Sequence, residues 1–278
     1  MKILIFGQGY IAHQFLNAFG SEAEISAVRI EDYSEVKKEL ELKKPDVVVN
    51  CAGKTGRPNV DWCEDHKMET LYSNVVAPVI LARACEELQL YMVHIGSGCV
   101  YDGYNDGKGY NEEDAPNFDG SYYSRTKAWS ERMLKDFKVL QLRLRMPFDS
   151  VPGERNFITK ITKYAKVISI PNSISVLEDF MHAAKTLIER RSVGIYNVTN
   201  PGFITHKEIL DMYIELVDPA YRYELFSVEE MEKVTKAKRS NCGLSVQKLE
   251  DEGIHLRPVA QAVRESLVLY RQHLEKMA

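Results

Sequence analysis

The sequence predicts an α/β protein with a doubly wound parallel sheet and a smaller second lobe. Three observations predict this fold. Short apolar runs end at glycine or polar residues, amphipathic segments alternate with them, and a glycine-rich turn follows the first run. Parallel strands buried on both faces form such continuous apolar runs. We expect the sheet domain over residues 1–150 and the smaller lobe over residues 151–278.

Composition excludes several classes of protein. The 278 residues are 45% hydrophobic and 27% charged, as in an ordinary soluble globular protein. A net charge of −4 argues against nucleic-acid binding and gives no sign of a membrane surface. The five cysteines show neither a Cys-x-x-Cys pair nor metal-ligand spacing with histidine, so we expect no metal site and a reduced, cytoplasmic protein. The first apolar run is too short for a signal sequence, and no window is long enough for a membrane span.

The first strand and its turn are typical of dinucleotide binding. The run over residues 2–6 is apolar after Lys2 and is predicted to be buried, and a helical pattern follows as far as Phe19. The turn between them predicts cofactor contacts at Gly7, Gly9, Tyr10 and Ile11. Glycines there let the backbone approach a pyrophosphate, which sits on the helix N-terminus. The alternative is a tight strand–helix turn with no ligand.

The second strand indicates which nicotinamide cofactor is used. It is predicted near residues 24–28 and ends at Arg29, with Asp32 three residues further on. A carboxylate at this position would select a free ribose 2′-hydroxyl, whereas a guanidinium suits a 2′-phosphate. Arg29 therefore favours NADPH over NADH, and we place Asp32 with it at the cofactor. The alternative for Arg29 is an ordinary surface arginine in a loop.

The remaining elements continue the alternation of strands and helices. A helix over 34–42 leads to a strand over 45–50, which ends in Cys51, Ala52 and Gly53, where a nicotinamide cofactor would pass. The sheet domain then continues with a helix over 67–88 and strands over 91–95 and 139–144. Residues 147–153 are predicted to be a hinge. The smaller lobe is expected to hold strands near 167–170 and 194–198 and helices near 178–190, 206–217 and 258–276.

Tyr123 and Lys127 are the predicted reductive pair. They lie four residues apart in a segment free of Pro and Gly until well past Lys135, which Ser121 or Asp119 can cap as a helix. On a helix the two share a face, with Cβ atoms roughly 5–6 Å apart. A phenol has a pKa near ~10, and a nearby ammonium stabilises its anion. The pair is predicted to protonate a carbonyl that is being reduced, although this spacing is also common on solvated helices.

Ser97 and Cys99 follow the strand over 91–95, at the carboxyl edge where open α/β sheets bind ligands. If the extended conformation continues, the two side chains project to the same side. Ser97 is then expected to offer its hydroxyl to the substrate carbonyl beside Tyr123. A free thiol has a pKa near ~8.5. Cys99 is therefore predicted either to exchange protons there or to be a small packing residue.

The glycine turn, Ser97, Asn74 and the Tyr123–Lys127 pair together resemble the extended short-chain dehydrogenases/reductases, which have a Rossmann domain. The more specific resemblance is to the bifunctional nucleotide-sugar 3,5-epimerase/4-reductases, including the plant enzymes of UDP-rhamnose synthesis. GDP-fucose synthase and dTDP-4-ketorhamnose reductase are more distantly similar. The relatives usually have two residues between the first two glycines, whereas only Gln8 intervenes here. The shared segments span nearly the whole chain: 55–64, 112–118, 155–160, 170–173, 197–202 and 239–241.

The resemblance implies a role for each matching residue. Tyr123 and Lys127 take the positions of the reductase pair, and Ser97 is their hydroxyl partner. Cys99 and Lys160 fall on the positions that exchange protons in epimerisation. Lys163, one turn further on, is the rival of Lys160. The cofactor is expected to contact the glycine turn, Arg29, Asp32, Cys51, Ala52, Gly53, Asn74, Tyr123 and Lys127. The sugar pocket is expected to be lined by Arg57, Asn59, Asp61 and Asn156, with Arg239 reaching the nucleotide diphosphate.

The implied reaction acts on a nucleotide-linked 4-keto-6-deoxyhexose, with UDP as the expected nucleotide. The C–H bonds at C3 and C5 are acidic because both are α to the ketone. Tyr123 and Ser97 would stabilise the enolate, and Cys99 and Lys160 would move protons on opposite faces. NADPH would then reduce C4 to give a UDP-L-rhamnose-type sugar or its 2-acetamido analogue.

The expected partners are this small-molecule substrate and a second copy of the chain in a homodimer, with no nucleic acid or membrane. Two alternatives remain open. One is a reductase of the dTDP-4-ketorhamnose type that does not epimerise. The other is a non-catalytic regulatory subunit on the same fold.

Overall fold

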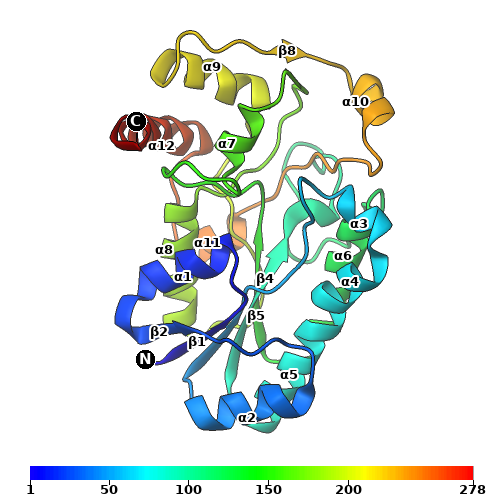
Figure 1. Cartoon of the computed structure of the whole chain (residues 1–278), viewed down its shortest axis with the longest axis vertical. Helices are drawn as coiled ribbons and strands as arrows, with labels where there is room; N and C mark the ends of the chain where they lie inside the picture. Colours follow the sequence, from blue (N-terminus) through cyan, green and yellow to red (C-terminus); the bar gives the residue numbers. More distant parts are fainter. Residues whose placement is uncertain (278) are drawn as a thin grey trace.

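The central feature of the computed structural model is a six-stranded parallel sheet with helices on both faces (Figure 1). The structure describes residues 1–277; Ala278, the last residue of the expected lobe, lies outside the described residues. The order of the strands is β2-β1-β3-β4-β5-β7, and every neighbouring pair is parallel. The strands are β1 (Ile3–Phe6), β2 (Ala23–Ile25), β3 (Val47–Asn50), β4 (Tyr91–Ser97), β5 (Val139–Leu144) and β7 (Gly194–Asn197). The predicted doubly wound fold is confirmed.

The sheet forms because its central strands are apolar on both faces. All four residues of β1 and the three valines of β3 have no exposed surface. Full burial of one such side chain stabilises the fold by roughly 1.5–3 kcal/mol, so these strands are held at the centre of the sheet. The chain first adds β2 on one side of β1 and then adds β3 on the other side. The direction in which successive strands are added therefore changes between β1 and β3. Ligands of open α/β sheets bind at such a point, outside the carboxyl ends of the strands.

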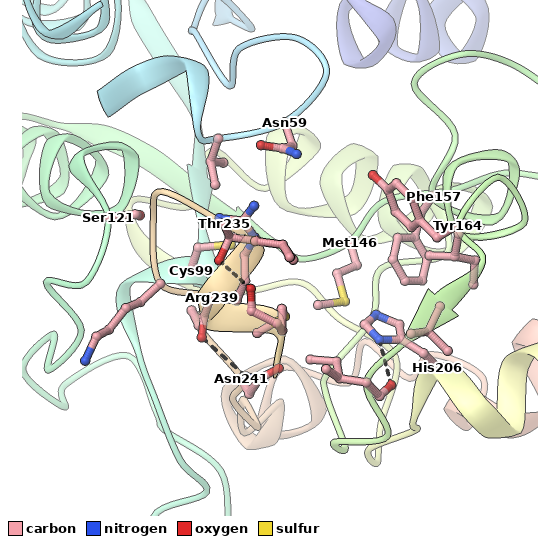
Figure 2. Close-up of a pocket in the computed structure, with 18 of the residues that line it drawn as sticks. Asn59, Cys99, Ser121, Met146, Phe157, Tyr164, His206, Thr235, Arg239 and Asn241 are labelled. Carbon is pink, nitrogen blue, oxygen red and sulfur yellow. Dashed lines mark hydrogen bonds between the residues drawn. The ribbon is translucent and has the colours of Figure 1, made fainter. Parts of the chain in front are cut away.

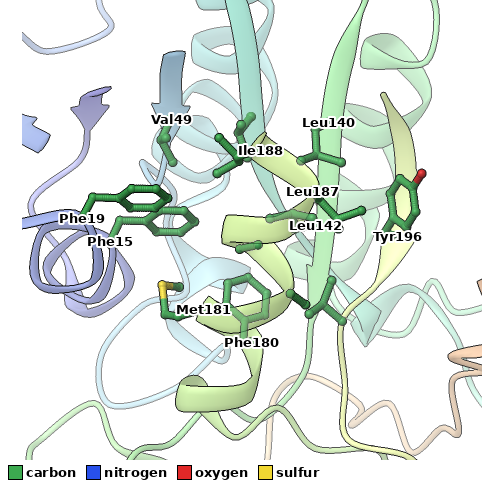
Figure 3. Close-up of a cluster of buried hydrophobic side chains, with 14 of the residues drawn as sticks. Phe15, Phe19, Val49, Leu140, Leu142, Phe180, Met181, Leu187, Ile188 and Tyr196 are labelled. Carbon is green, nitrogen blue, oxygen red and sulfur yellow. The ribbon is translucent and has the colours of Figure 1, made fainter. Parts of the chain in front are cut away.

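Helices cover both faces of the sheet, each through its own apolar cluster. Phe15, Phe19 and Phe180 pack beside Val49 and Leu142 on one face (Figure 3). The helices on that face are α1 (Tyr10–Phe19), α8 (Leu177–Glu189) and the short α11 (Gln247–Asp251). The opposite face carries α2 (Tyr33–Lys43), α5 (Ala77–Glu87) and α6 (Tyr122–Leu134), whose buried side chains form a second cluster with β1, β3 and β4.

The helix predicted over 67–88 is present, but a π turn interrupts it. Its segments are α4 (Lys67–Leu71), the π turn (Tyr72–Val76) and α5, and the four-residue α3 (Trp62–Asp65) precedes them. Such π turns inside α-helices often occur at functional sites. Asn74 lies in this turn and points toward the loop after β3.

The second lobe packs around its own core above the carboxyl edge of the sheet (Figure 1). It contains α7 (Phe157–Ile161), β6 (Lys166–Val167), α9 (His206–Leu216), β8 (Glu224–Leu225), α10 (Val228–Val234) and α12 (Val259–Met277). Strands β6 and β8 pair in parallel as a separate small sheet. The strand near 194–198 was expected in this lobe, but it is β7 and lies at the edge of the main sheet beside β5. Helix α8 also packs on the main sheet, so the chain returns to that sheet after residue 150.

The second strand is shorter than the predicted 24–28. It ends at Ile25 because Ser26 redirects the backbone. The Ser26 hydroxyl donates to Glu39 at 2.9 Å and accepts the backbone N–H of Val28 at 3.1 Å. A hydroxyl that satisfies a backbone donor two residues ahead favours a turn over a strand. Within residues 1–277, no helix is both long and apolar enough to cross a bilayer.

Candidate active site

The glycine turn lies where β1 and β3 diverge. Gly7 has φ of +106°, and a Cβ added to it would lie 2.7 Å from the backbone nitrogen of Ala52. Only glycine therefore fits here, because the turn approaches the end of β3 too closely for a side chain. Gly9 is the N-cap of α1, and no atom lies within 4 Å of a Cβ built on it. The helix N-terminus thus faces open space, which fits a bound pyrophosphate.

The side chains of Tyr10 and Ile11 pack against the apolar cluster under α1. Burial raises the pKa of Tyr10, and the nearby Asp149 carboxylate raises it further. These two residues therefore offer a ligand their backbone at the start of α1.

Asn74 fixes the loop that follows β3. Its side-chain oxygen accepts the backbone N–H of Lys54 at 2.7 Å, and its amide donates to the Lys54 carbonyl at 3.0 Å. The same amide donates to the Thr126 hydroxyl of α6 at 3.1 Å. Asn74 thus ties Lys54, the residue that follows the segment Cys51–Gly53, to the helix that carries Tyr123. Burial raises the pKa of the Cys51 thiol, so this cysteine stays protonated.

Arg29 and Asp32 lie on the loop after β2, but only Arg29 is free for a ligand. The Arg29 side chain is 84% exposed and, within residues 1–277, forms an ion pair only with Glu31, at 3.5 Å. Asp32 instead caps α2, accepting the backbone N–H of Glu35 at 3.0 Å. A free guanidinium beyond the end of β2 suits the 2′-phosphate of NADP.

Ser97 and Tyr123 meet at the carboxyl end of β4. Ser97 is the last residue of β4 and 4% exposed. Ser121 caps α6, as one of the two predicted caps, by accepting the backbone N–H of Ser124 at 3.0 Å. The cap starts the helix one residue before Tyr123. Burial raises the pKa of the Tyr123 phenol, while the Ser97 hydroxyl opposes the shift. Tyr123 therefore remains protonated near neutrality, as an acid that donates a proton must.

Lys127 lies one helical turn after Tyr123 and is directed at β4. Its ammonium donates to the carbonyl of Ile95 at 2.8 Å. Burial lowers the pKa of Lys127 to about 8, although the Glu131 carboxylate works in the opposite direction. The charge on Lys127 is thus more easily lost than that of an ordinary lysine.

A buried histidine that the sequence analysis did not single out lies behind Lys127. His94 Nε2 lies 3.5 Å from both the Lys127 ammonium and the Ser130 hydroxyl, and His94 Nδ1 lies 3.1 Å from the Asn50 amide. Burial and the Lys127 charge lower the pKa of His94 well below its ordinary value, so the ring is neutral. These contacts join β3, β4 and α6. The only sequence signal was a polar residue within an otherwise apolar strand.

Cys99 lies beside Tyr123, although not in the predicted conformation. The extended segment ends at Ser97, and residues Gly98–Val100 form a 3₁₀ turn. The turn forms because the Ser97 hydroxyl accepts the backbone N–H of Cys99 at 3.2 Å. The expected same-side projection from an extended strand is therefore wrong. The turn nevertheless leaves the Cys99 side chain in the wall of the cavity that Tyr123 also lines.

The cavity has a volume of about 390 Å³, within the usual range for small-molecule sites. Figure 2 shows Cys99, Arg239 and Asn241 near one end and Phe157, Tyr164 and His206 near the other. The His206 ring lies 5.3 Å from that of Phe157, and its Nδ1 is 3.2 Å from the carbonyl of Ile168. Burial lowers the pKa of His206 to about 4, so the ring is neutral. The cavity therefore combines a polar end with an aromatic end.

The loop over 55–61 supplies two of the predicted substrate residues. Asn59 lines the cavity. Asp61 forms a two-point ion pair with Arg239, with N–O distances of 2.8 and 3.0 Å. Burial works to raise the pKa of Asp61, but the hydrogen bonds from Arg239 and from the backbone of Ala237, together with the Arg239 charge, lower it overall. Arg57 lies outside this arrangement; its side chain is 70% exposed and reaches Glu154 only at 3.9 Å.

Asn156 does not line the cavity, contrary to the prediction. Its side chain is fully buried and caps α7, accepting the backbone N–H of Ile158 at 2.9 Å. Its amide donates to the carbonyls of Asp149 and Val151 at 2.8 and 3.0 Å. All of its polar atoms are thus used within the fold. Asn156 positions the short helix that carries Lys160.

Lys160 and Lys163 differ in their surroundings. Lys160 lies on α7 between Phe157 and Ile161, two residues that line the cavity, although Lys160 itself is not among the lining residues. It is partly buried, and burial lowers its pKa, assisted by the Arg155 charge. Lys163 follows the helix and is exposed. The structure thus holds Lys160 close to the cavity wall and leaves Lys163 in solvent.

Arg145 is the second residue that the sequence analysis did not single out. It follows β5, is 1% exposed, and lines the cavity. One of its terminal nitrogens donates to Cys99 Sγ at 3.2 Å and to the Ser240 hydroxyl at 3.2 Å. Its neighbour Arg143, equally buried, forms a two-point ion pair with Glu131 instead. Alternating arginines at the end of a strand were the only available signal.

Comparison with known proteins identifies the family. A model of the RmlD substrate binding domain matches residues 1–272. The bifunctional dTDP-4-dehydrorhamnose 3,5-epimerase/dTDP-4-dehydrorhamnose reductase of Arabidopsis thaliana is 40% identical over 97% of this chain and 92% of its own length. A trifunctional UDP-glucose 4,6-dehydratase/UDP-4-keto-6-deoxy-D-glucose 3,5-epimerase/UDP-4-keto-L-rhamnose-reductase of the same plant is 41% identical, and the chain spans 41% of that longer protein. The crystal structure of the UDP-rhamnose synthase of Acanthamoeba polyphaga mimivirus matches with a TM-score of 0.92 and 33% identity, covering 97% of this chain and 99% of that one. The chain therefore belongs to the family of the RmlD substrate-binding domain.

Proposed function

We propose that the protein epimerises C3 and C5 of a nucleotide-linked 4-keto-6-deoxyhexose and then reduces C4 with NADPH. The observation that carries this proposal is that one cavity is lined by both Tyr123, an acid suited to carbonyl reduction, and Cys99, a thiol suited to proton exchange. The Arabidopsis relative that matches over most of its own length is named for both reactions. The expected product is a UDP-L-rhamnose-type sugar.

NADPH is the cofactor that the residues at the sheet edge fit. The glycine turn leaves the N-terminus of α1 open for the pyrophosphate, and the free guanidinium of Arg29 suits the 2′-phosphate. Lys127 and Tyr123 lie at the adjoining end of β4, where the nicotinamide ribose would be held. When bound, NADPH supplies the hydride that reduces C4.

The remaining chemistry belongs to the side chains. Removal of a proton from C3 or C5 leaves an enolate, and Ser97 and Tyr123 would stabilise its oxygen by hydrogen bonds. Inversion requires the proton to return from the opposite face, so it needs two groups. Cys99 serves one face and Lys160 the other. During the later reduction, Tyr123 donates a proton to the carbonyl oxygen.

The nucleotide would occupy the region beyond Arg239, where the cavity becomes aromatic. A nucleobase can stack on rings such as Phe157 and Tyr164. Arg239, which Asp61 holds in place, would offer a diphosphate the N–H groups that Asp61 does not bind. The second lobe, which carries these residues, would thus cover the nucleotide sugar. UDP is the nucleotide we expect, and the homodimer implied by the resemblance stays a prediction.

A reductase without epimerase activity is the alternative. It would need Tyr123 but would give Cys99 no reason to line the cavity. The non-catalytic subunit is disfavoured in turn because Ser97, Tyr123 and Lys127 are all present at the sheet edge.

Product analysis by NMR distinguishes the alternatives. The protein is incubated with NADPH and with UDP- or dTDP-4-keto-6-deoxyglucose, and the configuration at C3, C4 and C5 is determined. Epimerase and reductase activity together give a 6-deoxy-L-sugar from the unepimerised substrate. A reductase alone consumes NADPH only with the pre-epimerised 4-keto-L-rhamnose nucleotide. Failure to oxidise NADPH with either substrate would rule out the proposed function.

A further inference from the structure

Two arginines on the same strand end are equally buried but differently neutralised. Arg143 and Arg145 are both 1% exposed. Arg143 binds both oxygens of Glu131 at 2.7 Å, which places a carboxylate against its charge. Arg145 donates to the carbonyl of Ser240 at 2.6 Å, to its hydroxyl, and to the side-chain oxygen of Asn172. Its Nε has no hydrogen-bond partner among the described residues.

A buried guanidinium without a counter-ion is costly, because an unpaired charge loses its hydration. Among residues 1–277, no carboxylate forms an ion pair with Arg145. The Asp102 carboxylate acts on it only at longer range, from an exposed position where it accepts the backbone N–H of Asn241 at 3.0 Å. The remaining acidic groups near Arg145 are the phenols of Tyr104 and Tyr123, whose pKa values burial raises, and the thiols of Cys99 and Cys242.

Hydrogen-bond direction distinguishes the two thiols. Cys242 donates its S–H to the carbonyl of Gly98 at 3.2 Å, so it must keep its proton. Burial also raises the pKa of Cys242. Cys99 is the acceptor in its contact with Arg145, at 3.2 Å, and it lines the cavity. A sulfur that accepts from a guanidinium is stabilised as the thiolate.

We propose that Arg145 holds Cys99 as a thiolate, which makes Cys99 the base of the epimerisation. Arg145 is then a positioning residue, because it acts through the sulfur. The inference rests on the proposed function for its role in turnover, but the ion pair itself requires no substrate. The other titratable groups that face Cys99 are Tyr123, Lys127 and Cys242.

The proton balance of the step follows directly. The thiolate takes the proton from C3 or C5, and the electron pair of the broken C–H bond becomes the enolate. The ammonium of Lys160 donates a proton to the opposite face of the same carbon, which restores the ketone. The pair ends as a thiol and an amine, and exchange with water returns it to thiolate and ammonium. No redox reagent is needed for this step.

The first test measures the thiolate without substrate. Alkylation of Cys99 by iodoacetamide is followed by peptide mass spectrometry at pH 7 in the wild type, Arg145→Gln and Arg145→Lys. Because a charge-assisted hydrogen bond is lost, Cys99 should be alkylated roughly ten- to a hundredfold more slowly in Arg145→Gln than in the wild type. Arg145→Lys should restore part of this rate. At pH 10 the alkylation rates of the three proteins should become equal. The Cys51 peptide, whose thiol is protonated, serves as the internal control. Equal rates at pH 7 in folded Arg145→Gln and wild type would overturn the proposal.

A second measurement needs no arginine variant, in case Arg145→Gln does not fold. The ultraviolet absorbance of a thiolate is compared between wild type and Cys99→Ser at pH 7. Excess absorbance in the wild type is expected, and its absence overturns the proposal.

A third measurement separates this proposal from the proposed function. Deuterium wash-in at C3 and C5 should slow in Arg145→Gln far more than reduction of the pre-epimerised sugar. If the wild type shows the thiolate but incorporates no deuterium at C3 or C5, the ion pair is supported and the epimerase function is refuted. Wash-in at the wild-type rate in Arg145→Gln would refute the role of Arg145 in turnover.

Discussion

Two sets of candidate catalytic residues, one around the cavity-lining Tyr123 and one beside the opposite wall, are anchored by very different amounts of structure. The reductive side consists of Ser97, Tyr123 and Lys127, carried by β4 and the 13-residue α6. Strand β4 is buried between β3 and β5, and the Lys127 ammonium is bonded to the Ile95 carbonyl. The opposite side carries Lys160 on α7, a helix of five residues whose N-terminus depends on the Asn156 cap.

This difference matches the chemistry proposed for each side. Hydride transfer and protonation of one carbonyl require fixed geometry, because a small misplacement of reacting groups lowers the rate steeply. Epimerisation at C3 and C5 requires a proton-transfer group to reach two carbons in turn. A long lysine on a short helix can do so, whereas a tyrosine on α6 beside the end of β4 cannot. Substitutions on the rigid side should therefore have the larger effects.

Tyr123→Phe should have the largest effect. It removes the acid that protonates the C4 oxygen, and a positioned general acid typically contributes ~10²–10⁴ in rate. NADPH oxidation with the pre-epimerised sugar should fall by that factor, while NADPH binding and the thermal unfolding midpoint remain close to wild type. The neighbouring Tyr122→Phe is the matched control, because Tyr122 packs on Trp129 at the outer side of α6. Similar turnover in both variants would remove Tyr123 from the mechanism.

Cys99→Ser should separate the two activities. The hydroxyl keeps the size of the side chain but ionises too little near neutrality to exchange protons well. In D₂O without NADPH, the wild type should incorporate deuterium at C3 and C5, and the variant should do so slowly. The variant should still reduce the pre-epimerised sugar. Cys242→Ser is the control, since Cys242 is fully buried and bonds the Gly98 carbonyl. Exchange at the wild-type rate in Cys99→Ser would make the thiol a packing residue.

Lys160→Met should have a smaller effect on exchange than Cys99→Ser, because water can protonate an enolate from an open face. Lys163→Met, one turn away and exposed, should leave exchange unchanged. Burial and the Arg155 charge lower the pKa of Lys160, so its ammonium is lost at lower pH than that of an ordinary lysine. The Lys160-dependent part of the exchange rate should therefore fall as pH rises, starting below ~10.4. If Lys163→Met slowed deuterium exchange as much as Lys160→Met, the assignment of the proton-transfer role to Lys160 would be wrong.

Local signals in the sequence predicted most of the sheet. Continuous apolar runs correspond to β1 and β3, and Ser121, one of the two residues predicted to cap the helix, marks the start of α6. Signals of this kind need only neighbouring residues. The return of β7 to the main sheet could not be predicted in the same way, because its partner β5 lies some fifty residues earlier in the chain.

The roles of side chains that depend on contacts distant in the chain could not be predicted from the sequence either. The turn at Cys99 depends on the Ser97 hydroxyl, which an extended or a turning backbone can equally well accommodate. Asn156 matches a shared segment but uses its polar atoms to cap α7. Arg145 becomes relevant only once the fold brings Cys99 and Ser240 to it. Local pattern thus suggested the candidate site, while the network around it required the tertiary structure.

Arg29→Ala should have the smallest effect, because this side chain lies at the surface of the cofactor site. A charge-assisted contact to the 2′-phosphate is worth roughly 1.5–3 kcal/mol, and screening by water at an exposed site favours the lower end. The dissociation constant for NADPH should thus rise about tenfold, and that for NADH should stay nearly constant. Isothermal titration at two salt concentrations measures both, and the wild-type preference for NADPH should weaken as salt increases. Glu31→Ala is the matched control, because it removes the carboxylate 3.5 Å from Arg29 and should leave NADPH binding intact or slightly tighter. Equal losses for NADPH and NADH in Arg29→Ala would show that Arg29 does not contact the 2′-phosphate, and cofactor selection would then depend on another cation.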